Sequence, residues 1–160
     1  MYQAYYESEV GLLEITANQE GITSVIFVDE RQEENKNEMI EQCINELDEY
    51  FKGKRKEFTV PLSAEGTAFQ KNVWDALYTI PYGVSASYLD IAEKVGNIKA
   101  VRAIGGANSR NPISIIVPCH RVIGKSGKLV GYAGGLWRKE WLLKHEGILE
   151  MTYGWEEGLF

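Results

Sequence analysis

The sequence predicts an α+β protein in two parts: a small sheet-and-helix domain over residues 1–62 and a mainly helical domain over residues 63–150, followed by a tail at residues 151–160. Two observations support this prediction. The first 30 residues are rich in β-forming residues, whereas apolar residues recur at helical spacing in most later segments. The charge also changes along the chain, because acidic residues are concentrated in the first part.

Three strands and one helix are expected in the first domain. The strand segments YQAYYES, GLLEITAN and GITSVIFV are separated by turn signals at Gly11 and in NQEG. Residues 36–52 then place apolar side chains at helical spacing, and Cys43 lies among them, so we expect it to be a buried core thiol. The segment EFTVPL predicts one more short extended piece.

The second domain is expected to begin with a helix in the segment TAFQKNVWDALYTIP. Thr67 and Gln70 fit a capping box at its start, and Pro81 marks its end. The final helix is expected in LWRKEWLLKHEG, with Gly147 just past its end.

Two further helices are expected between these. Ser87 and Asp90 predict the start of the first and Gly96 suits its C-terminal cap, while the second is expected from about Ile98 to Ser109. The pair predicts a helix-turn-helix, although any antiparallel pair of helices gives the same pattern. After them, the apolar run ISIIVP predicts a short buried strand and KLVGY a second, and the whole resembles a winged helix.

Composition and charge limit the classes of protein to which the chain can belong. The chain has 160 residues, 44% apolar and 25% charged, which argues against disorder, and no run approaches the roughly 18 apolar residues of a membrane helix. The N-terminus lacks the pattern of a secretory signal, so we expect a cytoplasmic protein with reduced thiols. The two cysteines and two histidines show no zinc-ligand spacing.

The distribution of charge favours contact with a polyanion. The net charge is −6, but the stretch from Lys94 to Lys139 carries nine Lys or Arg and no Asp or Glu. Within it, the second helix of the predicted helix-turn-helix carries Lys99, Arg102 and Arg110, and its small residues at 105–107 allow close approach to a surface. This combination suits a helix laid into a DNA groove. A solvated basic surface is the alternative.

The segment IIVPCHRVIG contains the candidate nucleophile of the chain. Cys119 is followed by His120 and Arg121, and a thiol becomes a nucleophile as its thiolate, which a base or a nearby cation promotes. Adjacent side chains do not face each other in a helix or strand, so a bridging water could relay the proton. Glu146 is the candidate to orient the histidine. A structural thiol is the alternative, and a hydrolase is disfavoured because no oxyanion hole is evident.

The sequence VPCHRV resembles the active-site signature of O6-alkylguanine-DNA alkyltransferases. Four further segments are similar to that family in order and spacing: GTAFQKNVWDALYTIPYG, SYLDIAEKVGN, KAVRAIGGANSRNP and GGLWRKEWLLKHEG. The resemblance covers about residues 66–147. It implies a ribonuclease H-like fold for the N-terminal domain and a winged helix-turn-helix for the C-terminal one.

The resemblance implies a catalytic set of five residues. Cys119 would accept the alkyl group from O6 of a damaged guanine in one displacement. His120 would act as the base through a water and Glu146 would orient it. Tyr88 would donate its hydroxyl to the guanine ring, and Asn111 would be the hinge that joins the recognition helix to the active-site strand. Tyr88 as a core aromatic and Asn111 as a cap before proline are the structural alternatives.

The resemblance also implies a DNA-binding set and a base pocket. Arg102 would fill the stack vacated by the flipped base, with a plain phosphate contact as its alternative. The other expected DNA contacts are Lys99, Gly105, Gly106, Ala107, Asn108, Ser109, Arg110 and Arg121. The carbonyls of Cys119 and Val122 would accept from the base amine and Tyr132 would line the pocket, beside Ala133, where many relatives have serine.

The implied function is DNA repair by direct reversal, with irreversible, single-turnover transfer from O6-alkylguanine to Cys119; activity on O4-alkylthymine stays open. We expect no cofactor and no metal, double-stranded DNA as the partner, no membrane, no obligate protein partner and a monomer. A non-catalytic lesion sensor is a second hypothesis, disfavoured because such proteins lack the reactive cysteine. A transcription factor using the same helix-turn-helix is a third.

Overall fold

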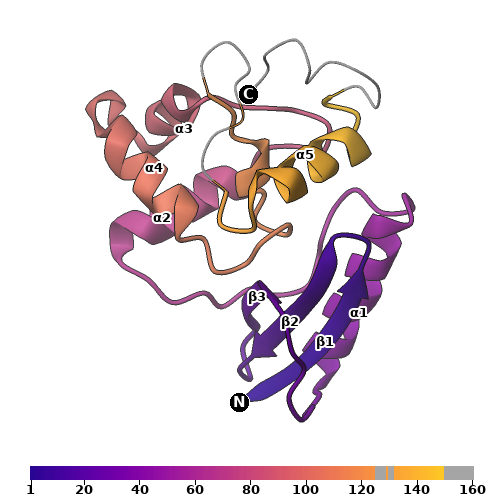
Figure 1. Cartoon of the computed structure of the whole chain (residues 1–160). Helices are drawn as coiled ribbons and strands as arrows, with labels where there is room; N and C mark the ends of the chain where they lie inside the picture. The colour runs from indigo at the N-terminus through magenta and orange to yellow at the C-terminus, as the bar shows by residue number, and fades with distance from the viewer. Residues whose placement is uncertain (125–128, 130–131, 150–160) are drawn as a thin grey trace. The chain divides into compact units, whose positions relative to one another are not determined.

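The computed structural model describes residues 1–124, 129 and 132–149. The chain divides into two compact units (Figure 1). The first contains residues 1–65 together with residues 112–116, and the second contains residues 66–111 together with the chain from residue 117. No helix in the described part is both long and apolar enough to span a membrane.

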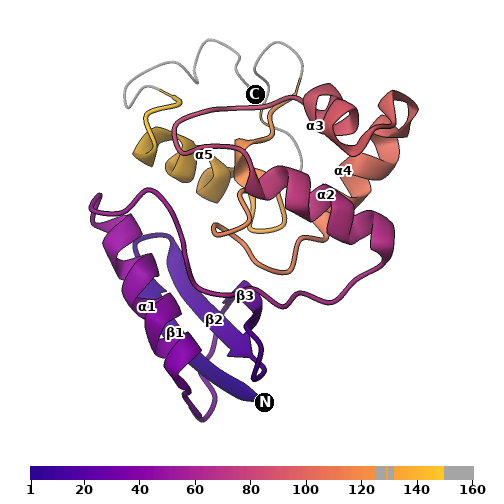
Figure 2. The ribbon, with the colours of Figure 1, turned by 180° about the vertical axis from the view of Figure 1, so that it is seen from behind.

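The first unit is an antiparallel sheet with a helix across one face, visible from both sides in Figures 1 and 2. Its described strands are β1 (Tyr2–Ser8), β2 (Gly11–Ala17) and β3 (Ile22–Val28), paired in that order. The helix α1 (Glu38–Phe51) begins at Asn37, whose side chain accepts from the Ile40 N–H. Its apolar stripe is buried and includes Cys43. Cys43 is fully buried, which confirms the expected core thiol, and burial raises the pKa of that thiol to about 12.

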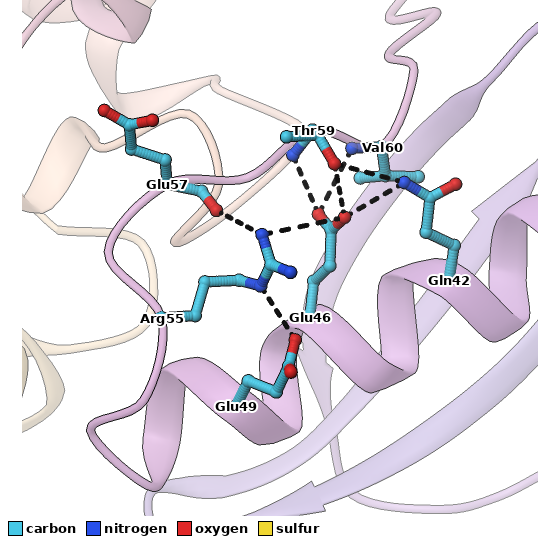
Figure 3. A network of polar contacts seen from close by, with 7 residues as sticks. All are labelled: Gln42, Glu46, Glu49, Arg55, Glu57, Thr59 and Val60. Atoms are coloured by element: carbon cyan, nitrogen blue, oxygen red, sulfur yellow. Dashed lines mark hydrogen bonds and ion pairs between the residues drawn. The ribbon is translucent and has the colours of Figure 1, made fainter.

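A buried carboxylate fastens the segment after α1 back onto that helix (Figure 3). Glu46 accepts hydrogen bonds from the Thr59 N–H at 2.9 Å, the Thr59 hydroxyl at 2.7 Å and the Val60 N–H at 3.1 Å. The Gln42 amide adds a fourth at 2.9 Å. Burial raises the pKa of Glu46, but these hydrogen bonds outweigh it and the net pKa is lowered.

The extended piece expected in EFTVPL forms no strand. It makes a single parallel bridge between Ile22 and Leu62, so the Glu46 network takes the place of a strand ladder there. Arg55 continues the network, because its Nε donates to Glu49 at 2.9 Å and its Nη1 donates to the carbonyl of Glu57 (Figure 3).

The prediction of a buried strand in ISIIVP is wrong. Only Ile113 forms a bridge, a parallel one with Val25, and residues 114–116 make a turn. Ile115 has a φ of 73°, a left-handed value that a β-branched residue rarely adopts and that ends an extended backbone. The run is buried as expected; residues 113–116 belong to the first unit, and residues 117 and 118 belong to the second.

The second unit contains the predicted helices. α2 (Ala68–Tyr78) begins with the predicted capping box, and α3 (Tyr88–Val95) begins where predicted, with Ser87 and Asp90 also forming a capping box. Gly96 ends α3 with a φ of 87°. The next helix starts as a short 3₁₀ turn, η1 (Ile98–Ala100), and continues as α4 (Val101–Ser109). The Trp74 indole of α2 donates to the Ala107 carbonyl of α4 at 2.9 Å, which ties these two helices together.

The last described helix is α5 (Leu136–His145), and Gly147 follows it with a φ of 78°. The strand predicted at KLVGY falls mostly outside the described residues, as does the tail at 151–160. A single parallel bridge joins Ala86 to Val122, which directly follows the segment Cys119–Arg121. The predicted helix-turn-helix is formed by α3 and by the helix that starts as η1 and continues as α4.

Candidate active site

Cys119 lies on a one-turn 3₁₀ helix, η2 (Cys119–Arg121), directly after Pro118. Two backbone hydrogen bonds stabilise this turn. The Arg121 N–H donates to the Pro118 carbonyl at 3.0 Å, and the Val122 N–H donates to the Cys119 carbonyl at 3.3 Å. The Cys119 side chain is 5% exposed. Burial raises the pKa of its thiol, while the Asn111 side chain and the charge of Lys139 act in the opposite direction. The resting thiol therefore holds its proton, and its activation needs a base.

The structure brings His120 and Glu146 together across 26 residues of sequence. The two side chains are fully buried, and His120 Nε2 lies 2.7 Å from Glu146 Oε2. Burial lowers the pKa of His120 despite the opposing carboxylate, so the resting imidazole is neutral. Nε2 donates to the carboxylate, which leaves Nδ1 as the acceptor. Nδ1 is buried and has no hydrogen-bond partner among the described residues, so it can take a proton.

Arg121 corrects one expectation from the sequence. It was expected to contact DNA, but its side chain is 7% exposed and donates to both oxygens of Glu146, at 2.7 and 3.1 Å. It also donates to the Ile80 carbonyl at 2.6 Å. A guanidinium held in this way is part of the interior. Burial raises the pKa of Glu146, but His120 and Arg121 outweigh it and hold that pKa well below its usual range.

Asn111 and Tyr88 approach the same thiol from the helix-turn-helix. The Asn111 amide donates to the Val117 carbonyl at 2.8 Å and lies within hydrogen-bonding reach of Cys119. Tyr88 is the first residue of α3. Burial raises its pKa, and the charge of Cys119 raises it further, which places the phenol in the electrostatic environment of the thiol. A Cβ added at Gly105 would lie 3.8 Å from the Tyr88 ring, so α4 passes close to it.

The expected DNA-binding residues separate into two groups. The exposed ones are Lys99, Arg102, Ser109 and Arg110, with Gly105 and Gly106 half-buried. Ala107 and Asn108 are 4% and 2% exposed, so they offer little surface to DNA, and the expected contact at these two residues stays a prediction. They lie on the face of α4 that packs against the other helices, because a helix presents one face to its own core. At Gly106 an added Cβ would meet nothing within 4 Å, so packing does not require that glycine.

Sequence reasoning missed Lys139. Its side chain is fully buried, and its Nζ donates to the Val122 carbonyl at 2.5 Å. Burial lowers the pKa of Lys139 to about 8, opposed by Cys119. A signal was present, because Lys139, Leu142, Leu143 and Glu146 follow i, i+3, i+4, i+7 spacing, which is one face of a helix. In the expected base pocket, Val122 and Tyr132 are buried and Ala133 is exposed.

A buried thiol with a histidine–glutamate pair, set against a helix-turn-helix with exposed basic residues, defines a DNA-binding protein with one reactive cysteine. Two family models match the chain. One is described as "6-O-methylguanine DNA methyltransferase, DNA binding domain" and covers residues 68–148. The other is the ribonuclease-like domain of the same family and covers residues 1–64. The chain belongs to the 6-O-methylguanine DNA methyltransferase family, and the predicted fold class is confirmed.

Relatives match along nearly the whole chain. The methylated-DNA--protein-cysteine methyltransferase of Methanosarcina acetivorans is 49% identical over 155 residues, covering 92% of this chain and 99% of its own. The protein of that name from Mycobacterium leprae is 46% identical over 155 residues, covering 91% and 94%.

Solved structures support the same family assignment. The crystal structure of Mycobacterium tuberculosis O6-methylguanine methyltransferase has a TM-score of 0.83 at 40% identity, covering 94% of this chain and 96% of its own. A structure from that organism in complex with DNA has a TM-score of 0.83 at 42% identity, covering 91% and 92%.

Proposed function

We propose that this protein repairs alkylated DNA by direct reversal, transferring the alkyl group of O6-alkylguanine in duplex DNA to Cys119. The observation that carries the proposal is the buried Cys119 turn with the His120–Glu146 pair beside it. The family supports the chemistry, because the relatives from Methanosarcina acetivorans and Mycobacterium leprae carry the name of a cysteine methyltransferase acting on methylated DNA.

The transfer is a single displacement at the alkyl carbon. The Cys119 proton passes through a water to His120 Nδ1, and Glu146 stabilises the imidazolium that forms. The thiolate sulfur attacks the alkyl carbon, the S–C bond forms and the C–O6 bond breaks. The oxygen keeps the electron pair, and the guanine takes up one proton, which His120 returns through the water. The product thioether is stable, so each molecule acts once and needs no cofactor.

DNA binding supplies the lesion to this buried thiol. The target atom lies inside the duplex, so the nucleotide must be flipped out, which costs a few kcal/mol. Arg102 is exposed on the first turn of α4 and is our candidate to fill the vacated stack. The exposed Lys99 and Arg110 are candidates to neutralise phosphates without reading sequence, which suits a lesion that occurs anywhere. The open space at Gly106 suits close approach of the DNA backbone.

The flipped base is expected to lie beside the Cys119 turn. We assign recognition of its amine to the carbonyls of Cys119 and Val122, since each carbonyl already accepts one hydrogen bond and has a second lone pair. We assign Tyr88 to the guanine ring and Tyr132 to the pocket wall. All the assigned groups come from one chain, so we propose that the protein acts as a monomer.

The deciding experiment is mass spectrometry after mixing the protein with a duplex containing one O6-methylguanine. We expect one methyl group on the peptide that contains Cys119, none in Cys119→Ser, and normal transfer in Cys43→Ser as the matched control. A duplex containing O4-methylthymine tests the second lesion in the same way. No mass change with tighter binding to the lesion duplex would make the protein a damage sensor, and no lesion preference at all would favour a transcription factor.

A further inference from the structure

Trp74 directs the polar group of a buried side chain at the end of α4. The residue is 6% exposed, and its indole N–H donates to the Ala107 carbonyl at 2.9 Å. A leucine or phenylalanine would fill the core without a polar group, and a buried N–H costs free energy unless it has an acceptor. The hydrogen bond therefore specifies how α2 and α4 meet (Figure 1).

The backbone at the end of α4 departs from an α-helix at the same carbonyl. In a continuing α-helix the Asn111 N–H would donate to Ala107, four residues earlier. It donates instead to Asn108, three residues earlier, at 3.3 Å. The Trp74 indole takes the place of that donor on the Ala107 carbonyl, together with the Arg110 N–H at 3.2 Å. Trp74 thus stabilises the tightened last turn, from which the chain leaves α4.

The Trp74 ring is fixed at both of its edges. A Cβ added at Gly66 would lie 2.6 Å from Cη2, so the backbone at Gly66 packs against the edge opposite the N–H. Pro112 explains why α4 stops, because proline has no N–H and disfavours a helical residue before it. It does not fix where the end of α4 lies relative to α2, whereas the bond from Trp74 to Ala107 does.

Asn111 connects this end of α4 to the thiol. Its amide donates to the Val117 carbonyl at 2.8 Å, and the same carbonyl accepts the Cys119 N–H at 2.8 Å. The Asn111 side chain also bonds to the Cys119 side chain and lowers the pKa of the thiol, against the effect of burial. Both contacts depend on the direction in which Asn111 leaves the last turn of α4.

We infer that Trp74 is a positioning residue for alkyl transfer. Its indole N–H, held on the Ala107 carbonyl, sets the end of α4 and with it the place of Asn111. Asn111 then meets the Val117 carbonyl and the Cys119 sulfur together. The inference rests on the proposed function for its role in repair, whereas its effect on the thiol is a property of the protein without DNA.

The test measures the reactivity of Cys119 without DNA. Iodoacetamide alkylates thiolates with loss of iodide, so its rate at each pH follows the thiolate fraction, and peptide mapping separates Cys119 from Cys43. Trp74→Phe keeps an aromatic ring but has no N–H. We expect it to move the inflection of the rate–pH profile up by about 0.5–1 pH unit, because a displaced Asn111 stabilises the thiolate less.

A double-mutant cycle tests whether Trp74 acts through Asn111. Asn111→Ala alone should move the inflection up at least as far as Trp74→Phe does. Adding Trp74→Phe to Asn111→Ala should then produce no further shift, because the connecting side chain is already gone. Additive shifts overturn the inference, and so does a folded Trp74→Phe with the wild-type profile.

The matched control is Val73→Ala, which removes buried volume from the neighbouring residue of α2 and leaves the indole N–H intact. We expect it to lower the melting temperature and to leave the profile in place. An equal shift in Val73→Ala would mean that general loosening moves the profile, and it overturns the inference. Tyr88, His120 and Lys139, the other titratable groups near the thiol, are left in place by all these substitutions.

A second variant covers the case in which Trp74→Phe does not fold. β-(3-Benzothienyl)alanine, inserted at position 74 alone, has the bicyclic shape of tryptophan with sulfur in place of the N–H group. It fills the same space between Gly66 and Ala107 but cannot donate a hydrogen bond. We expect the same upward shift from it, and the wild-type profile in this protein overturns the inference.

Failure of the proposed function gives a different result. Iodoacetamide requires no DNA, so a protein that takes no methyl group from the lesion duplex still reports the effect of Trp74 on Cys119. Conversely, normal methyl transfer by the wild-type protein with an unshifted Trp74→Phe profile overturns the role of the tryptophan only.

Discussion

Replacement of Glu146 by glutamine tests the reasoning about the site most directly, because it changes one atom and one charge. In the native site Glu146 Oε2 accepts from His120 at 2.7 Å and from Arg121 at 3.1 Å, and Oε1 accepts from Arg121 at 2.7 Å. In Glu146→Gln one of these oxygens becomes an NH₂ group that donates. If that group faces His120, the imidazole must accept at Nε2 and carry its proton on Nδ1, the atom that should receive the Cys119 proton.

Two magnitudes follow from this geometry. Removing one member of a buried ion pair leaves Arg121 with an uncompensated charge, which costs about 3–5 kcal/mol in unfolding free energy. Loss of a general base lowers rates by about 10²–10⁴-fold. We therefore expect Glu146→Gln to be less stable by about that free energy and to transfer the methyl group at least about a hundredfold more slowly.

The assays are urea denaturation and quenched single-turnover transfer from an O6-methylguanine duplex. Glu140→Gln is the matched control, because Glu140 lies on α5 with a side chain 27% exposed and pairs with Lys144. A partly exposed surface pair of this kind contributes about 1 kcal/mol or less. A Glu146→Gln protein that transfers at the wild-type rate would refute the role assigned to the His120–Glu146 pair.

The pH dependence of stability gives an independent check of the same carboxylate. The pKa of Glu146 is lowered in the folded protein, so the unfolded chain takes up its proton first as the pH falls. The stabilisation from this group is complete above the ordinary carboxyl pKa of about 4.3 and is lost as the pH falls below it. Glu146→Gln should therefore show a flatter acid limb, and a limb parallel to that of the wild type would contradict the shift.

Three further predictions concern other parts of the chain. Arg102→Ala should lose transfer from duplex DNA, keep the reactivity of Cys119 with iodoacetamide, and reduce the salt slope of DNA binding by about 0.9 if the residue also neutralises a phosphate. Gly106→Ala should stabilise α4 by about 0.5–1 kcal/mol, since the added methyl meets nothing, yet bind duplex more weakly; unchanged binding would exclude close DNA approach there. Glu46→Gln should destabilise the protein by about 1–3 kcal/mol in urea and leave the transfer rate unchanged, and an equal loss in the more exposed Glu49→Gln would contradict the importance of the buried network.

The elements that the sequence predicted well depend on local chemistry. The two capping boxes involve residues three apart, and the left-handed cap at Gly96 needs only a residue without a Cβ. The adjacency of Cys119 and His120 is likewise written in the chain, and the motif around them predicted the family. In these cases the partners are neighbours in sequence, so no knowledge of the tertiary structure was needed.

The errors have one physical origin, which is that burial and partnership depend on segments far apart. The apolar run ISIIVP was predicted to be a strand, but a strand needs a partner for its whole ladder, and only Ile113 finds one. Arg121 was expected to contact DNA as part of the set that the family resemblance implies, and its burial was not foreseen. Its carboxylate partner lies 25 residues further along the chain.

By itself, then, the sequence determined the helices with their caps, the change from acidic to basic residues along the chain and the candidate nucleophile. The tertiary structure decided which charged groups are inside. It buried Lys139, Arg121 and Glu146 around the Cys119 turn, where the low dielectric makes each charge depend strongly on its neighbours. A sequence records that these charges exist, but only the packing of α5 against the turn decides how they act on the thiol.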